Sequence, residues 1–238
     1  MKEGLNVHEK GKHIKTTRFR NSYKTKTRRS APPKRKIKNV YILYITPHKK
    51  RRGGMPKAKS IHIENVVASV ILNQRLDLNL IAERLPNTEF DPDQFPGLVL
   101  RLEQPKTATL ISNSGKMVCT GSKSEKDAVK AVKKIVESLR EVGIDIKNEP
   151  IIQVQNIVAS ANLGVELNLE EAAFLLENTL YEPEQFPGLI YRMHNPKVVI
   201  LLFGSGKAVI TGAKREEDIF VAVDRVMEVL TEKGIIRE

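Results

Sequence analysis

The chain repeats itself once. Residues 63–144 align with residues 154–235 at a constant offset of 91 positions and without a gap, and 37 of the 82 aligned positions are identical. Three motifs occur in both copies: QFPGL at 94–98 and 185–189, SGK at 114–116 and 205–207, and V-x-T-G-x-K at 118–123 and 209–214. Solenoid repeats are shorter, about 20–50 residues. The sequence therefore predicts a duplicated half-domain and a pseudo-two-fold molecule, which suits a ligand of near-two-fold symmetry such as duplex DNA.

The positive charge of the chain is confined to its first quarter. The formal net charge is +12, but residues 1–60 hold 20 Lys and Arg against 2 Glu, and the remainder holds 20 basic against 26 acidic residues. The repeat region is thus mildly acidic. If it binds nucleic acid, its basic residues must gather on one face.

Residues 1–60 form a basic N-terminal extension that we expect to be disordered. The segment has no sustained periodicity, and Pro32-Pro33 and Gly53-Gly54 would interrupt any helix or strand. It cannot bury enough apolar surface to offset its ordering entropy. Two interpretations remain open. The extension is a basic arm that adds salt-dependent affinity for phosphates, or it lies upstream of a translation start at Met55.

Several classes of protein are disfavoured by composition. The one cysteine, Cys119, allows no internal disulfide or cysteine-based metal site, and we interpret it as an apolar filler in a strand of an intracellular protein. The five histidines show no metal-ligand spacing, and neither a phosphate loop nor a nucleophile–base pair is apparent. We therefore expect no enzyme, metal or cofactor. No apolar run approaches the ~20 residues that span a bilayer, so no membrane association is expected.

Each repeat follows an α+β plan. Hydrophobic periodicity, with turn signals at Pro105 and Ser114-Gly115, separates strand-like from helix-like runs. Asp77 and Ser124 are expected N-caps, and Gly143 is the expected end of the last helix. We expect, in the first copy, a strand at 61–72, a helix at 78–85, strands at 98–102, 107–111 and 116–120, and a helix at 124–142. Two such units side by side predict one curved sheet with helices on one face and a bare apolar face that requires a partner.

Strand alternation places the same four side chains on the bare face of each copy. These are Asn65, Val67, Val118 and Thr120, and then Asn156, Val158, Val209 and Thr211. Amide and hydroxyl groups can bond the acceptors of a minor groove, which A·T and T·A share, while valine offers no partner to the guanine amino group. The alternative is that these side chains only pack within their strands and that the two asparagines only cap or turn the chain. The duplication of all four residues favours DNA reading.

Two further sets of residues fit DNA. Phe95 and Phe186 precede Pro-Gly at bends, where an aromatic ring can wedge between base steps, although packing beneath their own loops is the alternative. Basic and hydroxyl side chains flank the strands and suit phosphate contacts, which position the protein without specifying sequence. This second set is Arg101, Ser114, Lys116, Lys123, Arg192, Ser205, Lys207 and Lys214.

The motifs that the two copies share resemble those of the TATA-box-binding protein family, and those of its archaeal members more than those of its eukaryotic members. The resemblance covers residues 61–236 and assigns residues 61–149 to a first repeat and 150–238 to a second. It implies a saddle in which a continuous, curved, antiparallel ten-stranded sheet grips the minor groove and four helices cover the convex face. It also implies a general transcription factor that bends the TATA element of a promoter in the nucleoid of an archaeal cell.

The resemblance adds roles for further residues. Leu110 and Leu201 would contact DNA beside the kinks, and Phe203 would be a second wedge in repeat 2. The matching position in repeat 1 is Ser112, which cannot wedge, so an asymmetric grip is expected. Glu182 and Glu184 would contact transcription factor B, which together with RNA polymerase completes the preinitiation complex. The protein would be a monomer on DNA, and a homodimer when free stays open.

Besides the hypothesis of an enzyme, two rival hypotheses about function remain. A basic RNA-binding protein would depend on residues 1–60, and their removal would abolish its binding. A protein-only adaptor would dock its partner on the bare sheet and would show no preference for A·T pairs.

Overall fold

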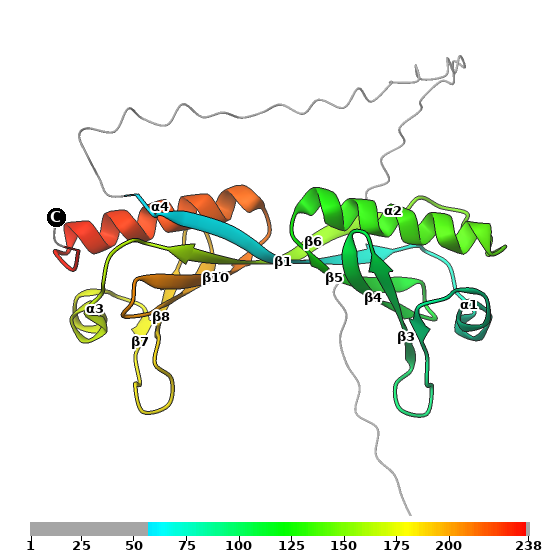
Figure 1. Cartoon of the computed structure of the whole chain (residues 1–238), viewed down its shortest axis with the longest axis horizontal. Coiled ribbons are helices and arrows are strands. Elements are labelled where there is room, and N and C mark those ends of the chain that lie inside the picture. Colours follow the sequence, from blue (N-terminus) through cyan, green and yellow to red (C-terminus); the bar gives the residue numbers. More distant parts are fainter. Residues whose placement is uncertain (1–56, 237–238) are drawn as a thin grey trace, which may run out of the picture. The chain divides into compact units, whose positions relative to one another are not determined.

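The computed structural model describes residues 57–236, so the expectations for residues 1–56, Met55 among them, lie outside the described residues. The expected end of the extension at residue 60 is too late, because β1 begins at Ser60 and the Lys59 N–H donates to the Asn162 carbonyl of the neighbouring strand at 2.7 Å. Ten antiparallel strands form one sheet in the order β2-β3-β4-β5-β1-β6-β10-β9-β8-β7 (Figure 1). The elements of the first repeat are β1 (Ser60–Ile71), α1 (Leu78–Arg84), β2 (Thr88–Glu89), β3 (Gly97–Glu103), β4 (Lys106–Ser112), β5 (Lys116–Ser122) and α2 (Glu125–Glu141). Those of the second are β6 (Ile151–Asn162), α3 (Leu169–Leu175), β7 (Thr179–Leu180), β8 (Leu189–Met193), β9 (Val198–Leu202), β10 (Lys207–Ala213) and α4 (Glu216–Glu232).

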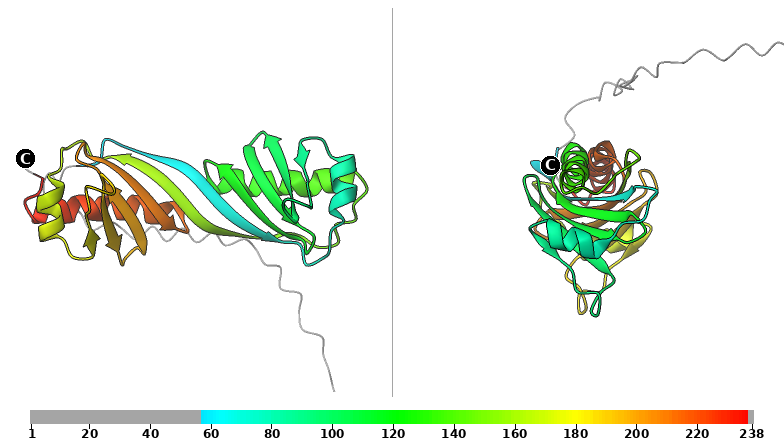
Figure 2. Two further views of the ribbon diagram at one scale, coloured as in Figure 1. Left: turned by 90° about the horizontal axis from the view of Figure 1, so that it is seen from below. Right: turned by 90° about the vertical axis from the view of Figure 1, so that its right-hand side faces the viewer.

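The expected saddle is confirmed. The sheet arches between two ends, helices α2 and α4 lie along its convex side, and α1 and α3 lie near the ends (Figures 1 and 2). Hydrophobic periodicity anticipates every element except β2 and β7, which have two residues each and are too short to show a pattern. Those two strands form the sheet edges and complete the expected ten. Among the described residues, no helix is both long and apolar enough to cross a membrane.

The central seam joins the two repeats. The 12-residue strands β1 and β6 pair antiparallel along their whole length, from Ser60 opposite Asn162 to Ile71 opposite Ile151. They cross the middle of the sheet side by side in the view from below (Figure 2). Their side chains also cross the seam, because Ile61 and Ile63 of β1 pack against the core beneath repeat 2. The two halves are therefore one sheet over two apolar clusters, one beneath each repeat.

Alternation along the strands separates the two faces. In β4, Thr107, Thr109 and Ile111 are buried against the helices, whereas Ala108 and Leu110 are half-exposed on the concave side. Helix α2 buries Ala128, Ala131, Val132, Ile135, Val136 and Leu139. Cys119 of β5 is fully buried, and burial raises the pKa of its thiol. The apolar role expected for Cys119 is thereby confirmed.

The two long helices begin at the middle of the molecule. Ser124 caps α2, accepting a hydrogen bond from the Asp127 backbone N–H at 3.0 Å as predicted. In α4 the N-cap is Arg215, whose side chain makes no capping bond. Each helix also receives a carboxylate from the other: the Glu125 N–H donates to Glu216 Oε1 at 2.7 Å, and the Glu216 N–H donates to Glu125 Oε1 at 2.8 Å.

Candidate nucleic-acid interface

The concave face carries a nearly uncharged strip across the middle of the sheet. Strand register lines up Val99, Leu110 and Val118 in repeat 1, and Ile190, Leu201 and Val209 in repeat 2. All six are half-exposed or exposed, and Val118 is 43% exposed. Val67 and Val158 lie on the same face of the central strands. The structure thus brings the six apolar residues expected from the sequence together on one surface and adds Val99 and Ile190, which the sequence analysis did not select.

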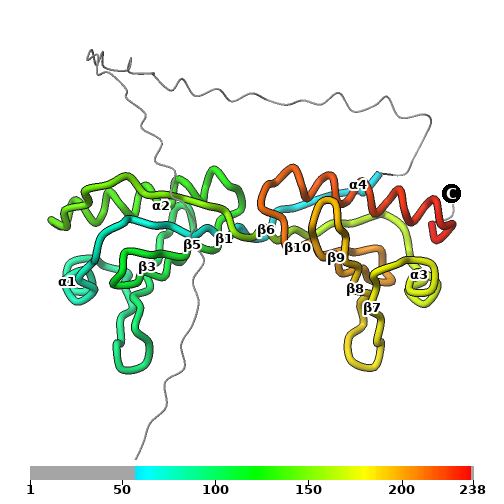
Figure 3. Tube along the Cα trace, turned by 180° about the vertical axis from the view of Figure 1, so that it is seen from behind, coloured from blue at the N-terminus to red at the C-terminus, as the bar shows by residue number. Residues whose placement is uncertain are grey.

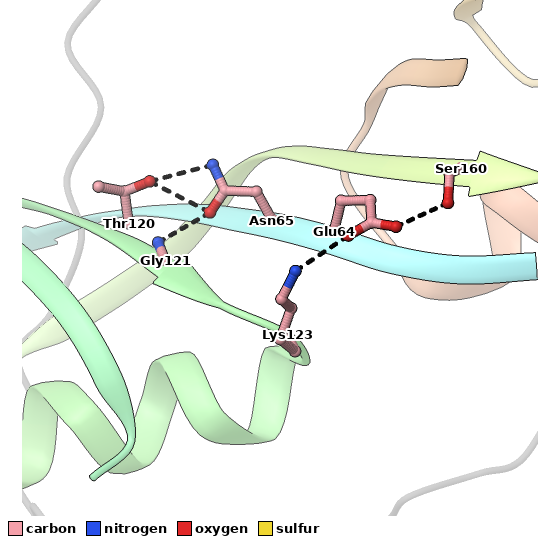
Figure 4. A network of polar contacts seen from close by, with 6 residues as sticks. All are labelled: Glu64, Asn65, Thr120, Gly121, Lys123 and Ser160. Carbon is pink, nitrogen blue, oxygen red and sulfur yellow. Dashed lines mark hydrogen bonds and ion pairs between the residues drawn. The ribbon is translucent and has the colours of Figure 1, made fainter. Parts of the chain in front are cut away.

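Asn65 is held by the end of the neighbouring strand. Its Oδ1 accepts a hydrogen bond from the Gly121 N–H at 2.7 Å, and its amide lies 3.1 Å from the Thr120 hydroxyl (Figure 4). The arrangement recurs in repeat 2, where Asn156 Oδ1 accepts from the Gly212 N–H at 2.7 Å. Thr211 takes the place of Thr120, 3.2 Å from the Asn156 amide nitrogen. Both amides are therefore fixed with the same orientation before any ligand arrives.

The Thr-Gly pair of the V-x-T-G-x-K motif has a structural cause in each repeat. The pairing of β1 with β5 shifts register opposite Val67, so Thr120 and Gly121 form a bulge that turns the Gly121 N–H toward Asn65. Gly121 has φ +99° and Gly212 has φ +96°, a region that favours glycine. Asn65 therefore fixes the chain through its oxygen. Its Nδ2 donates one hydrogen bond to the Thr120 hydroxyl and carries a second N–H beside it.

The phenylalanines are positioned by the glycines that follow them. Phe95 is 48% exposed and lies over Gly97, where a Cβ would come within 2.5 Å of the ring. Phe186 is 37% exposed and lies over Gly188 in the same way. The Phe186 ring also meets the Phe203 ring edge to face, with centroids 5.9 Å apart and planes at 66°. The expected bends hold these rings at the surface rather than beneath their loops.

Repeat 1 lacks the second ring. Ser112 stands opposite Gly97 in the β3–β4 register, as Phe203 stands next to Gly188 in repeat 2. The Ser112 hydroxyl lies 3.0 Å from that of Ser114, in the β4–β5 hairpin. One end of the face therefore carries a pair of aromatic rings and the other carries one ring and a small polar group.

The basic residues differ in their partners. Arg101 forms an ion pair with Glu89, and Lys123 forms one with Glu64 at 3.0 Å. Glu64 also accepts a hydrogen bond from the Ser160 hydroxyl at 2.6 Å, and that bond and Lys123 lower the pKa of Glu64 (Figure 4). Within residues 57–236 no carboxylate pairs with Arg192 or Lys214. Lys116, Lys207, Ser114 and Ser205 are exposed at the β4–β5 and β9–β10 hairpins.

Sequence reasoning missed Glu64 and Glu89. A signal was present, because the aligned positions in repeat 2 are Gln155 and Leu180, so both acidic residues interrupt the repeat. Together with Arg101, Lys106 and Lys123, Glu64 lines an open hollow of about 410 Å³ at the edge of the concave face of repeat 1. Among the described residues, no group of three or more His, Cys, Asp or Glu is arranged to hold a metal ion.

The two bends, residues 90–96 and 181–187, project on the side opposite α2 and α4 (Figure 3). In the first, the Asp91 carboxylate is occupied, accepting bonds from the Asp93 N–H at 3.1 Å and the Gln94 amide at 2.7 Å. In the second, Glu182 and Glu184 are exposed, and their carboxylates make no hydrogen bond or ion pair with another residue of the described region. The bends therefore present different acidic surfaces.

Known proteins match the chain throughout the region that carries these features. The family described as "Transcription factor TFIID (or TATA-binding protein, TBP)" matches residues 60–142 and again 151–233. The TATA-box-binding protein of Sulfurisphaera tokodaii is 56% identical over 183 residues, which is 77% of this chain and 92% of the relative. That of Pyrodictium occultum is 54% identical over 194 residues, covering 82% and 98%.

A solved structure agrees with the sequence comparison. The chain is similar to Methanococcus jannaschii TBP with a TM-score of 0.67 and 51% identity, over 73% of this chain and 99% of that one. The family is described as a transcription factor and the relatives are named TATA-box-binding proteins, and neither name is that of an enzyme, in line with the sequence prediction. The twofold match, the high identity to archaeal relatives and the shared saddle lead to one conclusion: the chain belongs to the TATA-box-binding protein family.

Proposed function

We propose that the protein is a general transcription factor whose concave face binds the minor groove of a TATA element. The observation that carries the proposal is the pair of fixed amides. Asn65 and Asn156 have their Oδ1 atoms occupied by glycine N–H groups, and each Nδ2 donates one hydrogen bond to the neighbouring threonine hydroxyl. Each amide therefore keeps one N–H donor for a ligand on this face. Minor-groove acceptors of A·T and T·A pairs are equivalent, so two such donors read A·T content and not its direction.

The surrounding surface supports the same preference. Val67, Val118, Val158 and Val209 are exposed or half-exposed beside the amides. They offer no acceptor to the guanine amino group, which would be desolvated without a partner in this strip. A G·C pair would then bind less well for two reasons: its guanine amino group loses a hydrogen-bond partner, and that group takes up space between the bases and the valines.

Aromatic insertion completes the proposed binding mode. Phe186 with Phe203 at one end, and Phe95 at the other, are rings at the surface beside bends. Rings of this kind unstack base steps and kink the duplex, and the TATA-box-binding protein family is itself the established example of such kinking. We propose that Leu110 and Leu201 contact the sugars and bases beside the kinks. The basic side chains that make no ion pair within the described region, Arg192 and Lys214 among them, would bind phosphates.

Recruitment is proposed for the second bend. Glu182 and Glu184 have carboxylates without a partner in the described region, whereas Asp91 in the first bend is occupied by its own loop. A basic surface of transcription factor B would therefore dock on the second bend, and RNA polymerase would follow as the initiation complex assembles on the chromosome. The exposed apolar strip would also allow free protein to pair as a homodimer, which DNA binding disrupts.

A competition binding experiment with the full chain tests minor-groove reading. Three duplexes with labelled ends are compared at physiological salt: a TATA-containing duplex, the same duplex with inosine·cytosine pairs, and one with G·C pairs. Inosine lacks the guanine amino group, so its pair presents the A·T pattern in the minor groove and the G·C pattern in the major groove. We expect A·T and inosine·cytosine duplexes to bind alike and to bend, and the G·C duplex to bind poorly.

Matched variants connect the result to the amides. Asn65→Ala and Asn156→Ala should each reduce the preference for A·T pairs, by about 10-fold if one base-edge contact is worth about 1–3 kcal/mol. Asn79→Ala, on the exposed side of α1, is the control. Equal affinity for all three duplexes, with strong salt dependence and no bend, would instead favour binding through residues 1–60.

A further inference from the structure

The outer rim of the concave face is built differently in the two repeats. In repeat 1, Glu89 of β2 stands opposite Val99 of β3, and Arg101 follows two residues later on the same face. The Arg101 guanidinium makes two contacts with the Glu89 carboxylate, Nε to Oε1 at 2.9 Å and Nη2 to Oε2 at 3.3 Å. This fork geometry occupies one edge of the guanidinium.

The equivalent rim of repeat 2 has no acidic residue. Leu180 of β7 stands opposite Ile190 of β8 and is 48% exposed, in the position that Glu89 takes in repeat 1. Arg192 follows Ile190 as Arg101 follows Val99, and no carboxylate of residues 57–236 pairs with it. The rim of repeat 1 thus carries an ion pair with no net charge, and the rim of repeat 2 carries an unpaired guanidinium beside an apolar side chain.

The difference matters because phosphate affinity depends on net positive charge. A side chain that neutralises a phosphate releases condensed counterions, and each such contact steepens the salt dependence of binding by about 0.9. An arginine that already shares its charge with a carboxylate contributes little of this effect, and the carboxylate itself repels the phosphate. Arg101 keeps Glu89 ionised, because its hydrogen bond and charge lower the pKa of Glu89.

We propose that Glu89 withdraws Arg101 from phosphate binding, so that Arg192 alone makes the outer arginine–phosphate contact and repeat 2 grips DNA more strongly. The inference deepens the proposed function and rests on it. The aromatic pair Phe186–Phe203 lies in the same half, and the central Lys123–Glu64 pair has no counterpart in repeat 2, where Gln155 aligns with Glu64. All three differences act in the same direction.

The internal repeat supplies matched exchange variants. Glu89→Leu gives repeat 1 the rim of repeat 2, and Leu180→Glu gives repeat 2 the rim of repeat 1. Affinity of the full chain for one TATA-containing duplex is measured across a series of salt concentrations. We expect Glu89→Leu to steepen the plot of log affinity against log salt by about 0.9, and Leu180→Glu to flatten it by a similar amount.

The double variant Glu89→Leu with Arg101→Ala shows which group causes the change. It should lose the added salt dependence, because the gain requires the released guanidinium and not just the removal of an acidic residue. Both exchanged positions are exposed edge-strand residues, and thermal unfolding of each variant checks that the fold is retained.

A palindromic duplex locates the effect. With uncharged methylphosphonates replacing the phosphates at one end, wild-type protein should orient repeat 2 toward the charged end, and Glu89→Leu should weaken that preference. Orientation is read by energy transfer from a dye on the first bend to the duplex ends. If Glu89→Leu and Leu180→Glu bind selectively but with unchanged salt dependence and orientation, that result would overturn this inference and leave the proposed function intact. Loss of A·T selectivity in the wild type would overturn the proposed function.

Discussion

Glu125 and Glu216 each cap the helix that the other begins. The two residues are related by the 91-residue offset, and each carboxylate accepts a hydrogen bond from the other's backbone N–H, at 2.7 and 2.8 Å. An unpaired N–H group and the positive end of the helix dipole both favour an anion at this position. The exchange therefore stabilises the first turns of α2 and α4 together at the centre of the molecule.

Replacing either residue should destabilise the protein to a similar extent. We expect Glu125→Ala and Glu216→Ala each to lower the free energy of unfolding by about 1 kcal/mol, the usual value of a lost helix cap, as measured by urea denaturation. Glu217→Ala removes a charge from the first turn of α4 without removing the exchanged bond, so its effect should be smaller. If Glu217→Ala costs as much as Glu216→Ala, the bond itself contributes nothing.

Ser112→Phe should make the two ends of the concave face alike. The new ring would stand opposite Gly97 and near Phe95, as Phe203 stands beside Gly188 and Phe186. We expect a larger DNA bend and slower dissociation, measured by energy transfer between the duplex ends and by stopped flow. Phe203→Ser is the reciprocal variant and should have the opposite effect. An unchanged bend and dissociation rate in Ser112→Phe would show that this position does not reach the DNA.

The pKa of Glu64 should depend on the opposite repeat. The Ser160 hydroxyl is the main cause of its lowered pKa, so Ser160→Ala should raise that pKa toward the ordinary 4.5, measured by NMR titration of the carboxylate. Because the folded pKa is lowered, this network stabilises the protein above about pH 4.5 and is lost as the pH falls through the folded value. Ser69→Ala is the matched control, since the Ser69 hydroxyl accepts from the Gln155 amide and donates to a backbone carbonyl rather than to a carboxylate. An equal shift of the Glu64 pKa in Ser69→Ala would refute the assignment.

Cys119 should react only when the sheet opens. Its side chain is fully buried and burial raises the pKa of the thiol, so little thiolate forms near neutral pH. We expect a thiol reagent to label native protein at a rate limited by unfolding, and to label it rapidly in urea. Rapid stoichiometric labelling of folded protein would show that β5 is more accessible than the structure indicates.

The repeat and its alternation were enough to predict one curved sheet with helices on one face and the four valines of its bare face. The saddle and the places of Leu110 and Leu201 came from the family resemblance. The central amides could be placed on that face, but the bond from Gly121 to Asn65 could not, because it depends on a bulge that only the β1–β5 register reveals. Cross-strand ion pairs were missed for the same reason. Glu64 and Lys123 are 59 positions apart, and nothing in their local sequence shows that they meet.

The seam between β1 and β6 also determines what half of this molecule would do. A single repeat would leave one 12-residue strand with its backbone groups unpaired along the sheet edge, together with apolar side chains that normally cover the neighbouring core. Since the two repeats are so alike, the best available substitute for the missing half is a second copy of the same half. An isolated repeat is therefore expected to form a homodimer across this strand, as β1 and β6 pair within the chain.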